Sequence, residues 1–158
     1  MVRLVVWCQV EDEAFLNVTA LRTLDLGYNR LERLHASLLS PLGESLRSLS
    51  VAGNLLSAEE LARLVRSVPH LTRVSLADMR MRALPAGLLA PLKELRVLNV
   101  SGNLLAGLHP ASLHPLLKLE LLDAARNHLV GLDEPSMLRL DNIDKVSECE
   151  SARVWSKG

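Results

Sequence analysis

The stretch LRTLDLGYNRL, residues 21–31, decides the fold of this chain because four further copies of it follow. The later copies are LRSLSVAGNLL (46–56), LTRVSLADMRM (71–81), LRVLNVSGNLL (95–105) and LELLDAARNHL (119–129). The starts at residues 21, 46, 71, 95 and 119 lie 25, 25, 24 and 24 residues apart. A fixed period of this length predicts a solenoid of stacked coils.

Within each copy, counted from position 0, the apolar residues stand at positions 0, 3 and 5. Positions 3 and 5 differ by two, so both side chains point to one side of a strand, and positions 2 and 4 point to the other. We therefore expect one strand per copy, stacked into a parallel sheet with its Leu/Val side facing the core. No coil can bury its apolar side alone, so stability has to come from its neighbours.

Position 8 is asparagine in four of the five copies: Asn29, Asn54, Asn103 and Asn127. An amide side chain both donates and accepts hydrogen bonds, so it can satisfy backbone groups that the turn after each strand would otherwise bury without partners. The third copy has Met79 at this position and Asp78 one place earlier. We expect a distorted turn there, or water in place of the amide.

The pattern LxxLxLxxNxL resembles that of the leucine-rich repeat family over about residues 11–143. The resemblance implies an α/β fold: a curved, horseshoe-shaped arc with a parallel β-sheet on the concave face and short helices, 3₁₀ turns and loops on the convex face. It also implies that the four asparagines form a ladder along the solenoid. We divide the chain into a repeat domain, residues 1–143, with a partial repeat at 11–20 and five full repeats, and a C-terminal tail, residues 144–158.

The segments between the copies differ in their capacity to form helices. Residues 57–70 predict the best helix, with a capping box of Ser57 and Glu60 at its start and Pro69 at its end. Residues 32–45 predict a short helical or 3₁₀ turn. Residues 82–94 and 106–118 each contain two prolines, so we expect irregular structure or at most one helical turn.

Both ends of the chain carry weaker copies of the pattern. Phe15 and Val18 precede Leu21 by six and three residues, so they resemble the back half of an earlier repeat. The strand before them is missing or is imitated by residues 4–7, which suggests a piece of a longer protein. After the fifth copy, Val146 would fill position 3 of a sixth repeat, and the tail beyond it would either cap the solenoid or remain disordered.

The resemblance places the ligand surface on the outward side of the strands. The candidate ligand-binding residues there are Asp25, Tyr28, Ser50, Arg73, Ser75, Asn99, Asp123 and Arg126. Five of these form the position-4 column, which is small and polar and about 19 Å long for strands ~4.8 Å apart, enough for an extended peptide. Tyr28, Arg73 and Arg126 are the strongest single candidates, since Tyr and Arg are enriched at binding hot spots. The alternative is that these residues only keep the exposed sheet face hydrated.

Other kinds of site have little support in the sequence. The formal net charge is zero and aromatic residues make up 3%, which argues against nucleic acid as a partner. No apolar run reaches the ~18 residues of a transmembrane helix. The five histidines lack metal-ligand spacing, and phosphate-loop and nucleophile-elbow motifs are absent, so we predict no catalytic residue, metal or cofactor.

The expected function is therefore a non-catalytic protein-protein interaction module that binds a protein or peptide. The period, the Leu84-Pro85 motif and the stretch FLNVTALRTLDLGYN (15–29) resemble secreted and receptor-type repeats such as those of Toll-like receptors, which implies part of a larger extracellular or cell-surface protein in recognition, adhesion or signalling. The sequon at Asn17 would then be a glycosylation site. Two alternatives stay open: an intracellular scaffold or signalling adaptor, favoured by two unpaired cysteines and no convincing signal peptide, and the regulatory arm of an enzyme. The sequence leaves the partner and the oligomeric state undetermined.

Overall fold

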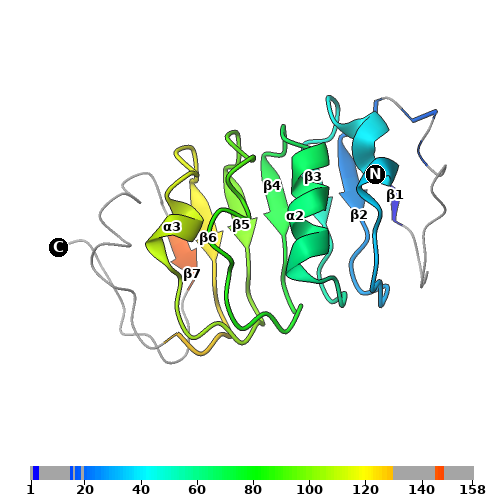
Figure 1. Ribbon diagram of the computed structural model, residues 1–158. Helices are drawn as coiled ribbons and strands as arrows, with labels where there is room; N and C mark the ends of the chain where they lie inside the picture. Colours follow the sequence, from blue (N-terminus) through cyan, green and yellow to red (C-terminus); the bar gives the residue numbers. More distant parts are fainter. Residues whose placement is uncertain (1, 4–14, 16, 19, 130–144, 148–158) are drawn as a thin grey trace.

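A single parallel β-sheet runs the length of the protein (Figure 1). The computed structural model describes residues 2–3, 15, 17–18, 20–129 and 145–147. Its strands lie in sequence order: β1 (Val2–Arg3), β2 (Thr23–Asp25), β3 (Ser48–Ser50), β4 (Arg73–Ser75), β5 (Val97–Asn99), β6 (Leu121–Asp123) and β7 (Lys145–Ser147). Position 3 of each copy pairs with position 3 of the next, as Leu24 does with Leu49 and Leu98 with Leu122. The predicted leucine-rich repeat solenoid and its register are confirmed.

The end strands extend this sheet beyond the five copies. Val2 of β1 pairs with Leu24, whereas residues 4–7, the expected imitation of a strand, lie outside the described residues. Val146 of β7 pairs with Leu122, so it occupies the position-3 place expected of a sixth repeat. Strand β7 thus comes from the segment assigned to the tail, and the domain boundary at residue 143 stays a prediction.

The core lies directly behind the sheet. Leu24, Leu26, Leu98 and Val100, at positions 3 and 5, are 0% exposed, and their polar strand neighbours are half-buried or exposed. Phe15 also packs into this core, whereas Val18 is 37% exposed. The N–H of Val18 donates to the carbonyl of Phe15 (3.0 Å), and this tight turn directs Phe15 inward and Val18 outward.

Short helical elements cover the far side of the core, in front of the sheet in Figure 1. They are α1 (Ala36–Leu39), the 3₁₀ turn η1 (Ser40–Leu42), α2 (Ala58–Ser67) and α3 (Pro110–Leu113). Helix α2 begins as predicted, because the hydroxyl of Ser57 accepts a hydrogen bond from the Glu60 N–H (3.2 Å). Residues 82–94, with their two prolines, form turns and no helix. All four predictions for these segments are confirmed.

The asparagine ladder joins successive turns after the strands. Asn103 Oδ1 accepts from the N–H groups of Met79 and Met81, both at 3.0 Å, in the preceding repeat. Its Nδ2 donates to the carbonyls of Leu76 and Val100, both at 2.8 Å. Asn54 makes the same set of bonds one repeat pair earlier, to Asn29, Leu31, Leu26 and Val51. Each buried amide therefore ties two coils together, and the predicted ladder is confirmed.

Met79 interrupts the ladder toward the second repeat but keeps the hydrogen bond to the fourth. Its own N–H is satisfied by Asn103, and its side chain is 7% exposed within the core. Within the described part of the chain, no acceptor takes the N–H groups of Asn54 and Leu56, which an asparagine at residue 79 would serve. The following residue, Arg80, has φ +56°, unlike its equivalents in the second, fourth and fifth repeats. Arg30, which follows Asn29 in the first repeat, has the same conformation at φ +58°, so this φ is not specific to the Met79 turn and the expected distortion there stays a prediction.

Candidate functional site

The position-4 column lies on the exposed face of the sheet, as predicted, but three of its side chains also stabilise the ends of their own strands. Asp25 Oδ1 accepts from the N–H of Gly27 (2.9 Å), and Asp123 Oδ1 accepts from the N–H of Ala125 (3.1 Å). Asn99 Oδ1 accepts from both the N–H (2.9 Å) and the hydroxyl (2.7 Å) of Ser101. Such side-chain turns are a common use of Asp and Asn where a strand ends. Ser50 and Ser75, between them in the column, are half-buried.

A second group of side chains lies beside this column, three residues after it in the repeat. The Tyr28 hydroxyl donates to Asp78 Oδ2 at 2.5 Å, and Arg126 Nη2 lies 3.9 Å from Asp78 Oδ1. All three residues stand at position 7, in the first, third and fifth repeats. We call Tyr28, Asp78 and Arg126 the rim row. It spans four strand spacings, about 19 Å.

Two glycines make room for the rim row. Gly53 and Gly102 occupy position 7 in the repeats between its members. A Cβ on Gly53 would lie 2.3 Å from Tyr28 Cδ1, and a Cβ on Gly102 would lie 1.9 Å from Asp78 Oδ1. Tyr28 therefore lies across the second repeat to reach Asp78, and the side chains of Asp78 and Arg126 approach each other over Gly102 of the fourth.

The backbone of the rim row holds an unusual conformation. Tyr28, Asp78 and Arg126 have φ of +58°, +54° and +54°, in a region that residues other than glycine rarely adopt. Hydrogen bonds between repeats hold them there: the N–H of Tyr28 donates to the Ala52 carbonyl (2.6 Å), and the N–H of Asp78 donates to the Ser101 carbonyl (2.9 Å). The same conformation occurs at Gly53 and Gly102 (φ +65° and +66°), so it belongs to position 7 of every repeat, and the rim row carries side chains where glycine fits most easily.

The electrostatics of the row keep Tyr28 in its protonated form. The hydrogen bond to Asp78 raises the pKa of Tyr28 most, and partial burial and the Asp78 charge raise it further, while Arg126 lowers it. Tyr28 nevertheless remains 66% exposed, so its ring is accessible to a partner. The row thus offers an aromatic ring held by a hydrogen bond at one end and a guanidinium group at the other.

We expect a pH titration to detect the Tyr28–Asp78 hydrogen bond directly. Tyr28 is the single tyrosine of the chain, so phenolate absorbance reports it alone. The midpoint should lie above the usual value of about 10, and Asp78→Asn should move it back toward that value. Because the pKa is raised in the folded state, the bond stabilises the protein fully below about pH 10 and is lost as the pH rises through the folded-state pKa.

Glu32→Gln, which removes an exposed carboxylate outside the row, is the matched control and should leave the midpoint unchanged. An Asp78→Asn variant that titrates like the unaltered protein would show that the two side chains do not interact in solution.

The structure brings together only part of the predicted ligand set. Tyr28 and Arg126 meet through Asp78, which is not among the predicted ligand-binding residues. The alternation Tyr, Gly, Asp, Gly, Arg at position 7 was the signal that could have identified it. Arg73 is exposed on strand β4 but stands at position 2, outside the rim row. Asn17 is exposed, as a glycosylation site requires.

The described residues contain no group of three or more His, Cys, Asp or Glu side chains that could hold a metal ion. None of their helices is long and apolar enough to cross a membrane.

Comparison with known proteins agrees with this architecture. The chain matches the family described as Leucine rich repeat over residues 9–56 and 69–129, and it belongs to the leucine-rich repeat family. Members of this family generally act as non-catalytic modules that bind other proteins. No curated protein sequence matches the chain.

Several solved structures share the fold. A leucine-rich repeat protein of Leptospira interrogans superposes with a TM-score of 0.75 at 22% identity, covering 93% of this chain and 36% of that one. The mouse RP105/MD-1 complex gives 0.58 at 28% identity, covering 69% of this chain and 18% of that one. TLR13 in its complex with single-stranded RNA gives 0.61 at 18% identity, covering 85% and 23%. The chain thus spans about a third or less of the length of these proteins.

Proposed function

We propose that this chain is a recognition module that binds a protein or peptide ligand on the exposed face of its sheet, with the rim row as the centre of the contact. The observation that carries this proposal is the fixed position of Tyr28, which is 66% exposed yet hydrogen-bonded to Asp78. A side chain that is ordered before binding loses little conformational entropy in the complex. Tyr and Arg are also the residues most enriched among those that dominate binding energy.

The position-4 column and Arg73 extend the proposed surface beside the rim row. Asp25 and Asp123 hold the strand ends through one carboxylate oxygen each. Arg73 is exposed near the middle of the sheet and takes part in no ion pair among the described residues. A partner seated here would meet a small polar floor with an arginine in it and an aromatic rim.

Site-specific photo-crosslinking in cells that express the full-length protein tests this assignment. A photoreactive amino acid at Ser48 or Ser75 on the sheet face should capture one defined partner protein, and the same amino acid at Arg66 on helix α2 should not. Gly53→Ala, which displaces Tyr28, should reduce the capture from Ser75. Equal capture from Arg66, or capture indifferent to Gly53→Ala, contradicts a sheet-face site centred on the rim row.

We further propose that the chain is part of a larger extracellular or cell-surface protein involved in recognition or signalling. The receptor-like style of its repeats and the exposed Asn17 support this compartment. Expression of the longest transcript in mammalian cells should give a protein whose mobility shifts on treatment with an N-glycosidase, and Asn17→Gln should abolish the part of the shift due to this site. A protein that is insensitive to the enzyme and remains in the cytosol would favour the intracellular scaffold or adaptor.

A further inference from the structure

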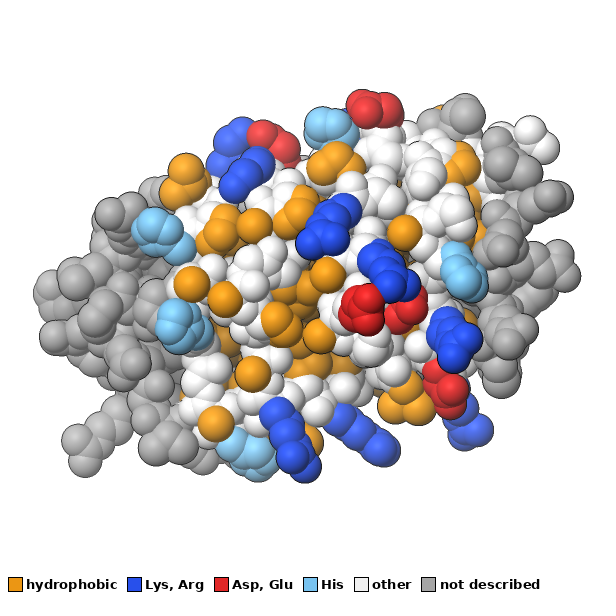
Figure 2. Space-filling model, in the orientation of Figure 1, with side chains coloured by type: hydrophobic (Ala, Val, Ile, Leu, Met, Phe, Trp, Pro, Cys, Tyr) orange, Lys and Arg blue, Asp and Glu red, His pale blue; other side chains and the backbone are white. Residues whose placement is uncertain are grey.

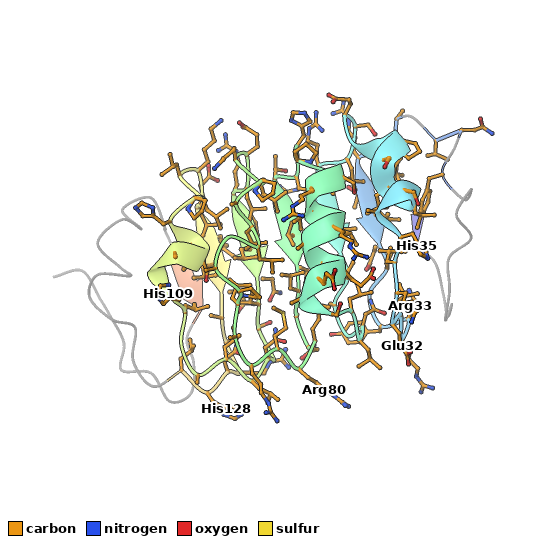
Figure 3. All side chains as sticks on the ribbon, viewed as in Figure 1. Glu32, Arg33, His35, Arg80, His109 and His128 are labelled. Carbon is orange, nitrogen blue, oxygen red and sulfur yellow. The ribbon has the colours of Figure 1, made fainter. Side chains whose placement is uncertain are left out.

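A second row of side chains follows the carboxyl ends of the strands, outside the sheet face. It consists of the position-9 residues of the five repeats: Arg30, Leu55, Arg80, Leu104 and His128. All five are exposed, and we call them the edge row. The strands of Figure 1 point toward this edge, and Figure 3 shows Arg80 and His128 directed away from the ribbon there. Cationic and apolar residues alternate along the row.

The arginines of this edge lack acidic partners within the described part of the chain. None of the ion pairs there involves Arg30, Arg80 or the nearby Arg82. The opposite edge, where the strands begin, is different: Lys118 pairs with Glu94 (2.6 Å) and Arg96 with Glu120. A protein of zero net charge thus has ion pairs between repeats on one edge and, among the described residues, none that involve the arginines of the edge row. Figure 2 shows Lys and Arg side chains gathered along this lower edge.

The leucines of the edge row are exposed because their neighbours occupy the core. Leu55 and Leu104 are 51% and 40% exposed, whereas the residues that follow them, Leu56 and Leu105, are 7% and 0% exposed. Consecutive residues cannot both face inward here, so a polar residue at position 9 would fit equally well. Large exposed side chains of this kind are apolar surface that a partner can cover.

The backbone at the two arginines is strained. Arg30 and Arg80 have φ of +58° and +56°, whereas Leu55, Leu104 and His128 have ordinary values. Glycine and asparagine adopt this region most readily, so arginine is a poor local choice.

We propose that the edge row binds an acidic segment of a partner protein, in which carboxylates and apolar side chains alternate at every second residue, because only these side chains lie on one face of an extended peptide. The row is about 19 Å long, which corresponds to about six residues of extended peptide. Carboxylates of the segment would pair with Arg30 and Arg80, and its apolar side chains would cover Leu55 and Leu104. The exposed leucines of the row and the low aromatic content favour a peptide over a uniformly anionic polymer.

Fluorescence anisotropy on the purified chain tests the proposal. The probe is a fluorescein-labelled peptide in which glutamate and leucine alternate at every second residue, with a small polar residue between them, so that both face the edge row. The double variant Arg30→Asn/Arg80→Asn removes both charges and keeps residues that tolerate the positive φ. We expect it to raise the Kd about 25-fold, at about fivefold per lost ion pair, and Leu55→Ser/Leu104→Ser to raise it about tenfold. Added salt should weaken binding to the unaltered protein.

Two variants on the helical side are the matched controls: Arg66→Gln removes an exposed cation, and Leu117→Ser removes a leucine that is 72% exposed. Circular dichroism verifies that all variants are folded. The proposal is wrong if the double arginine variant binds the peptide unchanged, or if Arg66→Gln weakens binding equally. It is also wrong if heparin or single-stranded RNA binds more tightly than the peptide and depends on the arginines but not on the leucines, because the edge would then be a general polyanion surface.

Discussion

Replacing Asn103 with alanine is expected to lower the free energy of unfolding by about 3–5 kcal/mol, the largest effect of any single substitution in a ladder turn. The amide is 2% exposed and makes four bonds of 3.0 Å or shorter to two repeats. Alanine removes all of them and leaves the N–H groups of Met79 and Met81 buried without their acceptor. Urea unfolding followed by circular dichroism measures the change.

Met79→Ala and Asn17→Ala are the controls for this prediction. Met79→Ala removes only apolar contact, because the hydrogen bond at that residue comes from its backbone N–H. Its effect through hydrogen bonding should therefore be small compared with that of Asn103→Ala. Asn17 is exposed, so its replacement should change stability by less than about 0.5 kcal/mol. Equal losses for Asn103→Ala and Asn17→Ala would remove the ladder as a source of stability.

Replacing Gly102 with alanine is expected to be the second most damaging change, lowering the free energy of unfolding by about 2–3 kcal/mol. One part of this loss comes from φ +66°, which disfavours any side chain. The other part comes from the new Cβ, which would lie 1.9 Å from Asp78 Oδ1 and has to displace it. Displacing Asp78 also breaks its bond to Tyr28, so the tyrosine titration should shift toward the usual pKa of about 10.

Gly87→Ala separates these two parts. Gly87 has φ +76°, but a Cβ there would meet nothing within 4 Å. Its replacement should lower the free energy of unfolding by only about 1 kcal/mol and should leave the titration of Tyr28 unchanged. If Gly102→Ala and Gly87→Ala behave alike in both measurements, the rim row contributes nothing beyond the backbone strain of its glycines.

The fold could be predicted almost completely from the sequence because its contacts repeat. The spacing of the leucines placed the strands and their register, and the pattern of Ser57, Glu60 and Pro69 placed the start and the end of helix α2. By spacing, Phe15 and Val18 match the back half of a repeat equally well, but only Phe15 is buried, because spacing cannot detect the turn in which the Val18 N–H donates to the Phe15 carbonyl. Local periodicity describes a coil well where a second coil covers it, and poorly at the end of the stack.

The candidate site was less accessible to this reasoning. The position-4 column was placed on the correct face, but the sequence did not reveal that Asp25, Asn99 and Asp123 already hold their own strand ends. Asp78 was not among the predicted ligand-binding residues, although its side chain contacts both Tyr28 and Arg126. The sequence predicts the face of a strand residue but not these contacts, because they depend on the direction that each side chain takes after the strand ends.

The sequence by itself determined that this chain is a stack of coils with leucines inside and asparagine amides between them, since each coil meets a near-identical copy and one pattern satisfies every interface. Only the tertiary structure decided which exposed side chains act together. Tyr28 and Asp78 are 50 residues apart in the sequence and form a hydrogen bond. They can meet because Gly53 in the repeat between them has no side chain where the Tyr28 ring lies, and both residues have a positive φ.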